Sequence, residues 1–171
     1  MASAAERRLF WGVAGTLIVG DLLTKLLAEA HLPRRMPLAV IGDWVQLRLV
    51  YNQGAAFGIH VGEHSRWIFL VLALIALAVL GSMARTTRPG DRFRLWALAL
   101  VCGGASGNLV DRLRSSMGVV DFVDVGVGAW RWPTFNLADS AITVGAAALA
   151  ISLWLEGRAE QRPKEVRAAG P

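Results

Sequence analysis

The sequence is poor in cysteine and in charged residues. A single cysteine, Cys102, excludes a disulfide within the chain, Cys-rich zinc sites and iron–sulfur clusters. Only 18% of the 171 residues are charged, whereas about 25% are charged in an average soluble domain. With 54% hydrophobic residues and a mean hydropathy of +0.45, the chain has too few polar side chains to cover a soluble surface. The composition therefore predicts a membrane protein.

Four long apolar segments account for most of this hydrophobicity. Residues 67–84 carry no charge, and a helix of this length crosses the hydrocarbon core of a bilayer. We therefore predict an all-α membrane protein, a bundle of four transmembrane helices at about residues 9–28, 67–85, 93–112 and 137–156. These helices form a single domain of residues 1–158, and the basic residues 159–171 are expected to form a disordered cytoplasmic tail.

The N-terminal segment has a second interpretation. Arg7 and Arg8 precede an apolar run, and Ala28-Glu29-Ala30 follows it, as in a cleaved secretory signal peptide. Asp21 and Lys25 interrupt the run where a signal peptide has uncharged or small residues. The sequence therefore favours a helix that is retained in the protein.

The distribution of basic residues predicts the orientation of the bundle. With the N-terminus inside, short segments on one side hold ten of the eighteen Lys and Arg residues: Arg7, Arg8, Arg85, Arg88, Arg92, Arg94, Arg158, Arg162, Lys164 and Arg167. Because cytoplasmic loops are enriched in Lys and Arg, both termini of this multi-pass protein are expected in the cytoplasm. The net charge of +5 is then an orientation signal, and no nucleic acid is expected as a partner.

The loop after the first helix contains a strand pattern. Residues 44–49 alternate apolar and polar side chains, which is typical of a half-buried strand. We therefore predict a small extracytoplasmic β element between the first and second helices. Residues 59–64, with His60 and His64, are expected to form a loop.

Polar residues gather at the predicted outer ends of the helices. Ionisable groups at membrane depth are costly, so they face the protein interior and usually mark function. Asp21/Lys25 and Asn108/Arg112 are each spaced four apart and share a helix face. Taken alone, each pair could instead be a structural ion pair that holds helices together: Asp21 with Lys25, and Asp111 or Asp139 with Arg112. The whole set predicts a site at the outer membrane face: Asp21, Lys25, Asn52, Asn108, Arg112, Asn136 and Asp139.

Two carboxylates are candidates for chemistry, Asp121 and Asp139. If both lie close to one water molecule, they cannot both ionise cheaply, so one pKa rises and the other falls. One carboxylate can then take a proton from water while the other protonates a carbonyl oxygen or leaving amine. Such a pair hydrolyses a peptide bond without a metal or cofactor. Asp124 is the alternative to Asp121.

Five motifs in a fixed order are more specific than any single residue: Asp21-x-x-Thr24-Lys25, Tyr51-Asn52-x-Gly54-Ala55-Ala56-Phe57-Gly58, Gly103-Gly104-Ala105-x-Gly107-Asn108-x-x-Asp111-Arg112, Val119-Val120-Asp121-Phe122 and Phe135-Asn136-x-Ala138-Asp139-x-Ala141-Ile142. With them the chain resembles the lipoprotein signal peptidases, or type II signal peptidases, over roughly residues 9–155. These are aspartic endopeptidases of the bacterial inner membrane with four transmembrane helices. One departure is Gly118, which directly precedes Val119 where the family is expected to have one residue between them. We therefore expect a differently shaped loop there.

The resemblance implies a role for each matching residue. Asp121 and Asp139 match the catalytic aspartates, and Asp21 and Lys25 match a polar pair that ends the first helix. The residues expected to support the dyad and bind the substrate backbone are Asn52, Asn108, Arg112 and Asn136. The implied substrate is a prolipoprotein whose cysteine carries diacylglycerol, cleaved just before that cysteine. Globomycin-type cyclic peptides are the implied inhibitors, membrane lipid surrounds the protein, and we expect a monomer.

Three other functions are each suggested by part of the sequence. Gly104-Ala105-Ser106-Gly107 is similar to the G-x-S-G of rhomboid serine proteases, but no histidine follows His64 to act as the base. Small residues at Gly103 and Gly107 are better explained as a helix contact face, and Cys102 as a small core residue. An ion- or proton-coupled transporter and a helix-packing assembly subunit remain alternatives. Four spans are few for a transporter.

Overall fold

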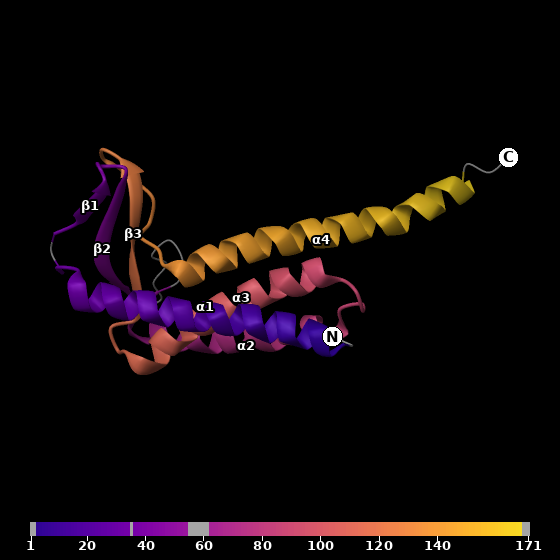
Figure 1. Cartoon of the computed structure of the whole chain (residues 1–171), viewed down its shortest axis with the longest axis horizontal. Helices are drawn as coiled ribbons and strands as arrows, with labels where there is room; N and C mark the ends of the chain where they lie inside the picture. The colour runs from indigo at the N-terminus through magenta and orange to yellow at the C-terminus, as the bar shows by residue number, and fades with distance from the viewer. Residues whose placement is uncertain (1–2, 35, 55–61, 169–171) are drawn as a thin grey trace.

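Helix α3 (Arg92–Arg114) lies at the centre of the molecule and contacts α1 (Ala4–His31), α2 (Ser65–Thr86) and α4 (Leu137–Ala168). The computed structural model describes residues 3–34, 36–54 and 62–168, and within them the side chains up to residue 159. Figure 1 shows the four helices with a sheet at one end of the bundle and both chain termini at the other.

All four helices are long and apolar enough to cross a membrane, over Ala4–His31, Gly62–Thr86, Arg92–Arg114 and Leu137–Ala159. The predicted bundle of four transmembrane helices is thereby confirmed. Helix α4 continues to Ala168, so helix occupies much of the segment for which the sequence predicts disorder. Residues 158–161, Arg-Ala-Glu-Gln, are all good helix formers. Of the loop predicted at residues 59–64, residues 59–61 lie outside the described residues, and Gly62–His64 forms a short 3-10 helix, η2.

Glycines on α3 let its neighbours approach closely. A Cβ at Gly103 would lie 3.0 Å from the Cα of Ala14 in α1, and a Cβ at Gly104 would lie 2.4 Å from the carbonyl oxygen of Ala138 in α4. At Gly107 the obstacle would be a carboxylate oxygen of Asp21, 2.6 Å away. These contacts support the interpretation of the glycines as a helix contact face.

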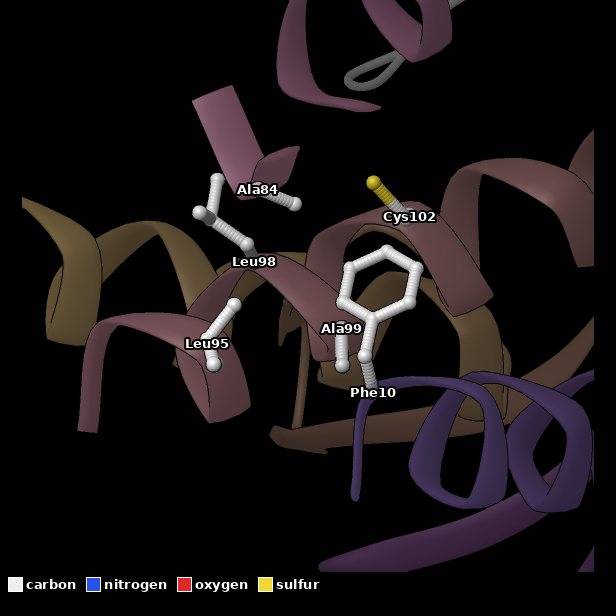
Figure 2. Packing of buried hydrophobic residues seen from close by; sticks show 6 residues of the cluster. All are labelled: Phe10, Ala84, Leu95, Leu98, Ala99 and Cys102. Atoms are coloured by element: carbon white, nitrogen blue, oxygen red, sulfur yellow. The ribbon is translucent and has the colours of Figure 1, made fainter. Parts of the chain in front are cut away.

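The apolar core lies at the end of the bundle away from the sheet. Its buried members come from α1, α2 and α3: Phe10, Ala84, Leu95, Leu98, Ala99 and Cys102. Figure 2 shows the Phe10 ring reaching from α1 over α3, between Ala99 and Cys102. Many outward-facing side chains are large, apolar and exposed, among them Val71, Leu74 and Ile75 of α2. In a bilayer such side chains face lipid.

The sheet joins segments from two different loops. Its antiparallel strands follow the order β1 (Leu38–Ile41), β2 (Val45–Asn52), β3 (Val119–Val127) and β4 (Trp130–Arg131). Strand β2 confirms the predicted β element between the first two helices, and β3 and β4 add the connection between α3 and α4. The register pairs Val50 with Asp121 and Asn52 with Val119, so the end of β2 lies beside the start of β3.

Gly118 begins this strand pairing. Its φ of +102° is a conformation that L side chains rarely adopt, and a Cβ there would lie 2.3 Å from the carbonyl oxygen of Asn52. Glycine therefore allows the chain to turn out of α3 and enter β3 directly beside β2.

Candidate active site

The predicted site residues gather where the sheet meets the helices. Strand β3 carries Asp121, the first turn of α4 carries Asp139, the end of α3 carries Asn108 and Arg112, and the end of β2 carries Asn52. All five line one cavity of about 1240 Å³. The fold thus brings together residues that are up to 87 positions apart in the sequence (52 to 139).

The start of α4 fixes the position of Asp139. Asn136 is the residue before the helix, and its side-chain oxygen accepts a hydrogen bond from the backbone N–H of Asp139 at 2.9 Å. In return, the backbone N–H of Asn136 donates to Oδ2 of Asp139 at 3.2 Å. This reciprocal pair satisfies two N–H groups that the first helical turn cannot pair internally. Asp139 is therefore held by the same interactions that begin the helix.

Asn136 also joins the two carboxylates. Its side chain is fully buried, and its Nδ2 donates to Oδ1 of Asp121 at 2.7 Å. Because its backbone N–H donates to Asp139, one residue contacts both aspartates. Nδ2 of Asn52 donates to Oδ2 of Asp121 at 3.2 Å, and Nδ2 of Asn108 donates to Oδ1 of Asp139 at 2.8 Å. Each carboxylate is thus oriented by two asparagine residues.

The environment of Asp121 favours its protonated form. The residue is only 3% exposed, and burial raises the pKa of its carboxyl group from 3.8 to about 7. The negative charge of Asp139 raises this pKa too, whereas hydrogen bonds from Asn52 and Asn136 and the charge of Lys25 lower it. A carboxyl group with a pKa near 7 can exchange a proton readily at neutral pH.

Arg112 ties the end of α3 to the residues that follow β2. Its Nη1 donates to the backbone carbonyl of Asn108 at 3.2 Å, and its Nη2 donates to the carbonyl of Gly54 at 2.9 Å. The backbone N–H of Gly54 in turn donates to Oδ1 of Asn52 at 2.9 Å. The guanidinium lines the cavity and helps to hold Asn52 beside Asp121.

Asp21 and Lys25 are brought close to the site, but they are not among the residues that line the cavity. Both are buried in the helix bundle, where Nζ of Lys25 lies 2.6 Å from Oδ2 of Asp21 and 2.9 Å from Oδ2 of Asp111. Asp111 also pairs with Arg114 at 2.7 Å. From the sequence, Asp111 is a possible partner of Arg112, whereas the structure pairs it with Lys25 and Arg114. Its position three residues after Asn108 was the signal that could have included it in the site.

Asp124, the alternative to Asp121, lies in a different environment. It is buried, its Oδ1 accepts a hydrogen bond from Nε of Arg131 at 2.7 Å, and it is not part of the cavity wall. Among the side chains that the structure describes, in residues 3–34, 36–54 and 62–159, no group of three or more His, Cys, Asp or Glu is placed to hold a metal ion.

The rest of the cavity wall is largely apolar. Helix α2 contributes Phe69 and Leu72, and α4 contributes Ile142 and Val144. Both helices are candidate membrane spans, so this wall lies at membrane depth. The cavity therefore combines two oriented carboxylates with an apolar surface suited to lipid-like groups.

Comparison with known proteins places the chain in a family. The model of a protein family described as signal peptidase (SPase) II matches residues 13–155. The chain belongs to the signal peptidase II family. It is therefore a membrane peptidase, as the five sequence motifs led us to expect.

Curated relatives and solved structures agree with this assignment. The chain is 40% identical over 157 residues to a lipoprotein signal peptidase from Treponema denticola, covering 87% of this chain and 90% of the relative. It is 46% identical over 140 residues to one from Paraburkholderia phymatum, covering 81% and 82%. A bacterial membrane enzyme solved at 2.3 Å resolution superposes with a TM-score of 0.78 at 28% identity, over 86% of this chain and 88% of that one.

Proposed function

We propose that this signal peptidase II removes the signal peptide from diacylglyceryl-modified prolipoproteins by cleaving just before the lipidated cysteine. Asp121 and Asp139 are the catalytic pair in this proposal. The observation that carries it is the bridge through Asn136, which orients both carboxylates on the wall of one cavity. No metal or other cofactor takes part.

The catalytic step follows from the different surroundings of the two carboxyl groups. Asp121, whose pKa is raised to about 7, holds the proton, and Asp139 is the base. Asp139 takes a proton from a water molecule as the water oxygen attacks the carbonyl carbon of the peptide bond, while Asp121 gives its proton to the carbonyl oxygen. The tetrahedral intermediate, which now carries two hydroxyl groups, then collapses: the C–N bond breaks, the leaving nitrogen receives the proton taken by Asp139, and one hydroxyl group returns its proton to Asp121.

The asparagines and Arg112 support this step. Asn52 and Asn136 orient Asp121, and Asn108 orients Asp139. Arg112 lines the cavity, where its guanidinium is suited to donate to carbonyl groups of the substrate backbone. Globomycin-type cyclic peptides would inhibit by occupying the same cavity.

The arrangement of the bundle supports an orientation with both termini in the cytoplasm of the bacterial cell. Figure 1 shows the two termini at the end opposite to the sheet, and α4 begins at the site end with Asp139 in its first turn. The basic residues near the termini favour the cytoplasmic side, and in this proposed orientation the catalytic pair lies at the outer face of the inner membrane. One chain supplies all the proposed site residues, as expected for a monomer surrounded by membrane lipid.

A lipid requirement tests the proposed substrate. Purified protein in detergent should cleave a diacylglyceryl-modified prolipoprotein with a kcat/KM about 100-fold higher than its unlipidated form. Such a difference, about 2.7 kcal/mol, needs only a net gain of about three to four acyl CH₂ groups on the apolar wall at about 0.8 kcal/mol each. The Asp121→Asn variant serves as the inactive control. Equal cleavage of both substrates would contradict the lipid requirement, and cleavage elsewhere than before the cysteine would contradict the proposed reaction.

The pH dependence of cleavage tests the assignment of Asp121 as the acid. The rate should fall as the pH rises through about 7, because Asp121 then loses the proton that it donates. Replacing Asn52 by leucine removes a hydrogen bond that lowers this pKa, so the fall should move to higher pH. The measurement is kcat/KM as a function of pH for both proteins. If kcat/KM falls at the same pH in the wild type and in Asn52→Leu, the fall is due to a group other than Asp121.

The same pKa also affects stability. Between pH 3.8 and about 7 the folded protein keeps a proton on Asp121 that the unfolded chain has already lost. The free energy of unfolding should therefore decrease as the pH rises through this range.

A further inference from the structure

A buried ionic cluster lies beneath the catalytic pair, formed by Asp21, Lys25 and Asp111, and we call it the Lys25 cluster. Asp21 and Asp111 are each 1% exposed, and Lys25 is fully buried. Replacing a buried ion pair by apolar residues is often neutral or stabilising, so stability alone is weak grounds for its presence. The cluster does not line the cavity, so it does not contact a substrate there. Its contacts are with the segments that carry the two catalytic aspartates.

Each carboxylate of the Lys25 cluster holds the backbone beside one catalytic aspartate. Oδ1 of Asp21 accepts a hydrogen bond from the backbone N–H of Ala138 at 2.9 Å, and Ala138 directly precedes Asp139. Oδ2 of Asp111 accepts one from the backbone N–H of Val120 at 3.1 Å, and Val120 directly precedes Asp121. Because Lys25 contacts both carboxylates, a single side chain connects the start of α4 with β3.

Lys25 has a third contact that reaches the catalytic pair through a side chain. Its Nζ donates to Oδ1 of Asn108 at 2.9 Å. An ammonium group only donates, so it fixes the Asn108 amide with its oxygen toward Lys25. The Nδ2 of Asn108 is then directed to Oδ1 of Asp139 at 2.8 Å. Nδ2 of Asn136 also donates to Oδ1 of Asn108, at 3.2 Å, which favours the same orientation.

We propose that Lys25 is a positioning residue, which sets the separation and orientation of Asp121 and Asp139 through Asp21, Asp111 and Asn108. This inference rests on the proposed function of the pair. Lys25 does not bind substrate in this view, in contrast to the polar residues of the cavity wall. Its removal should therefore lower the rate of the chemical step and leave substrate binding nearly unchanged.

Two variants test this role, Lys25→Met and the double variant Asp21→Asn/Lys25→Met. The double variant removes one positive and one negative charge, and it keeps a side-chain oxygen to accept the hydrogen bond from Ala138. Arg94→Met is the matched control, because Arg94 pairs with Glu156 between α3 and α4 and lies near the opposite end of α3. The measurements are kcat, KM and Tm on the lipidated prolipoprotein in detergent.

We expect kcat to fall about 100-fold in both Lys25 variants, as for a misplacement of reacting groups by about 1 Å. KM should stay within about threefold of the wild type, because the residues of the cavity wall that bind the substrate are unchanged. Arg94→Met should retain kcat, and its Tm should be comparable with that of the double variant.

The possible results separate this proposal from the proposed function. An unchanged kcat in the double variant, or a raised KM with unchanged kcat, would overturn the positioning role. Unfolding of both Lys25 variants would overturn it too, because the cluster would then hold the bundle together. If the wild type does not cleave the lipidated substrate, or Asp121→Asn still cleaves it, the proposed function itself fails.

Discussion

Replacing Asp121 by asparagine is expected to lower kcat/KM for the lipidated prolipoprotein by about 10⁴-fold while the protein remains folded. Asparagine has nearly the same shape, and its side-chain oxygen can still accept the hydrogen bond that Asn136 donates to Asp121 at 2.7 Å. It cannot hold and release the proton that the reaction needs. Cleavage assays in detergent, with Tm measured on the same samples, test this expectation. Asp139→Asn should have a loss of similar size.

Asp124→Asn provides the matched control on the same strand. Asp124 is as buried as Asp121, at 3% exposed, but it pairs with Arg131 instead of facing the cavity. Loss of this charge is expected to lower Tm, because a buried pair with one partner removed is destabilising, and to leave kcat/KM within about threefold. Retained cleavage in Asp121→Asn, or its loss in Asp124→Asn, would contradict the assignment of the catalytic pair.

The ends of the helices were harder to predict than their existence. Apolar runs predicted all four spans, because the hydrocarbon core requires about 20 apolar residues in helical form. Helix α1 nevertheless begins at Ala4, five residues before the apolar run. Ser3 accepts a hydrogen bond from the N–H of Glu6 at 3.1 Å, and Glu6 accepts one from the N–H of Ser3 at 2.9 Å. This capping box was readable in the sequence, although hydropathy does not report it.

The sheet was predicted only in part, for a different physical reason. Alternation of apolar and polar residues is a local property, and it identified β2. The pairing of β2 with β3 joins residues about 70 positions apart, such as Val50 and Asp121. No local pattern specifies such a partner, because it depends on how α2 and α3 return the chain to the same end of the bundle.

The sequence predicted which residues belong to the site. It did not predict which of them line the cavity and which lie buried beneath it. Spacing of four residues places Asp21 and Lys25 on one face of α1, but it does not say which neighbour that face meets. In the structure it meets α3 beside Gly107, so both side chains lie beneath the cavity. The rotation of each helix is set by such close contacts. The glycines of α3 therefore affect the geometry of the catalytic pair.

Gly104 is the position where this dependence should be largest. A Cβ there would lie 2.4 Å from the carbonyl oxygen of Ala138 and 2.8 Å from Cγ1 of Ile142, so Gly104→Ala must move α4 away from α3. We expect the free energy of unfolding to fall by about 2–3 kcal/mol, as for other overpacked cores. The hydrogen bond between Asn108 of α3 and Asp139 of α4 spans the same contact. We therefore expect kcat to fall by about 100-fold as well.

Gly15→Ala is the control for this substitution, because nothing lies within 4 Å of a Cβ at Gly15. Alanine favours a helix over glycine by about 1 kcal/mol, so this variant should be as stable as the wild type or more so, with unchanged kcat. Thermal unfolding and cleavage by both variants in the same detergent give the comparison. If Gly104→Ala matched Gly15→Ala in both, α4 could move relative to α3 without disturbing Asp139, and the close contact at Gly104 would not be what sets the catalytic geometry.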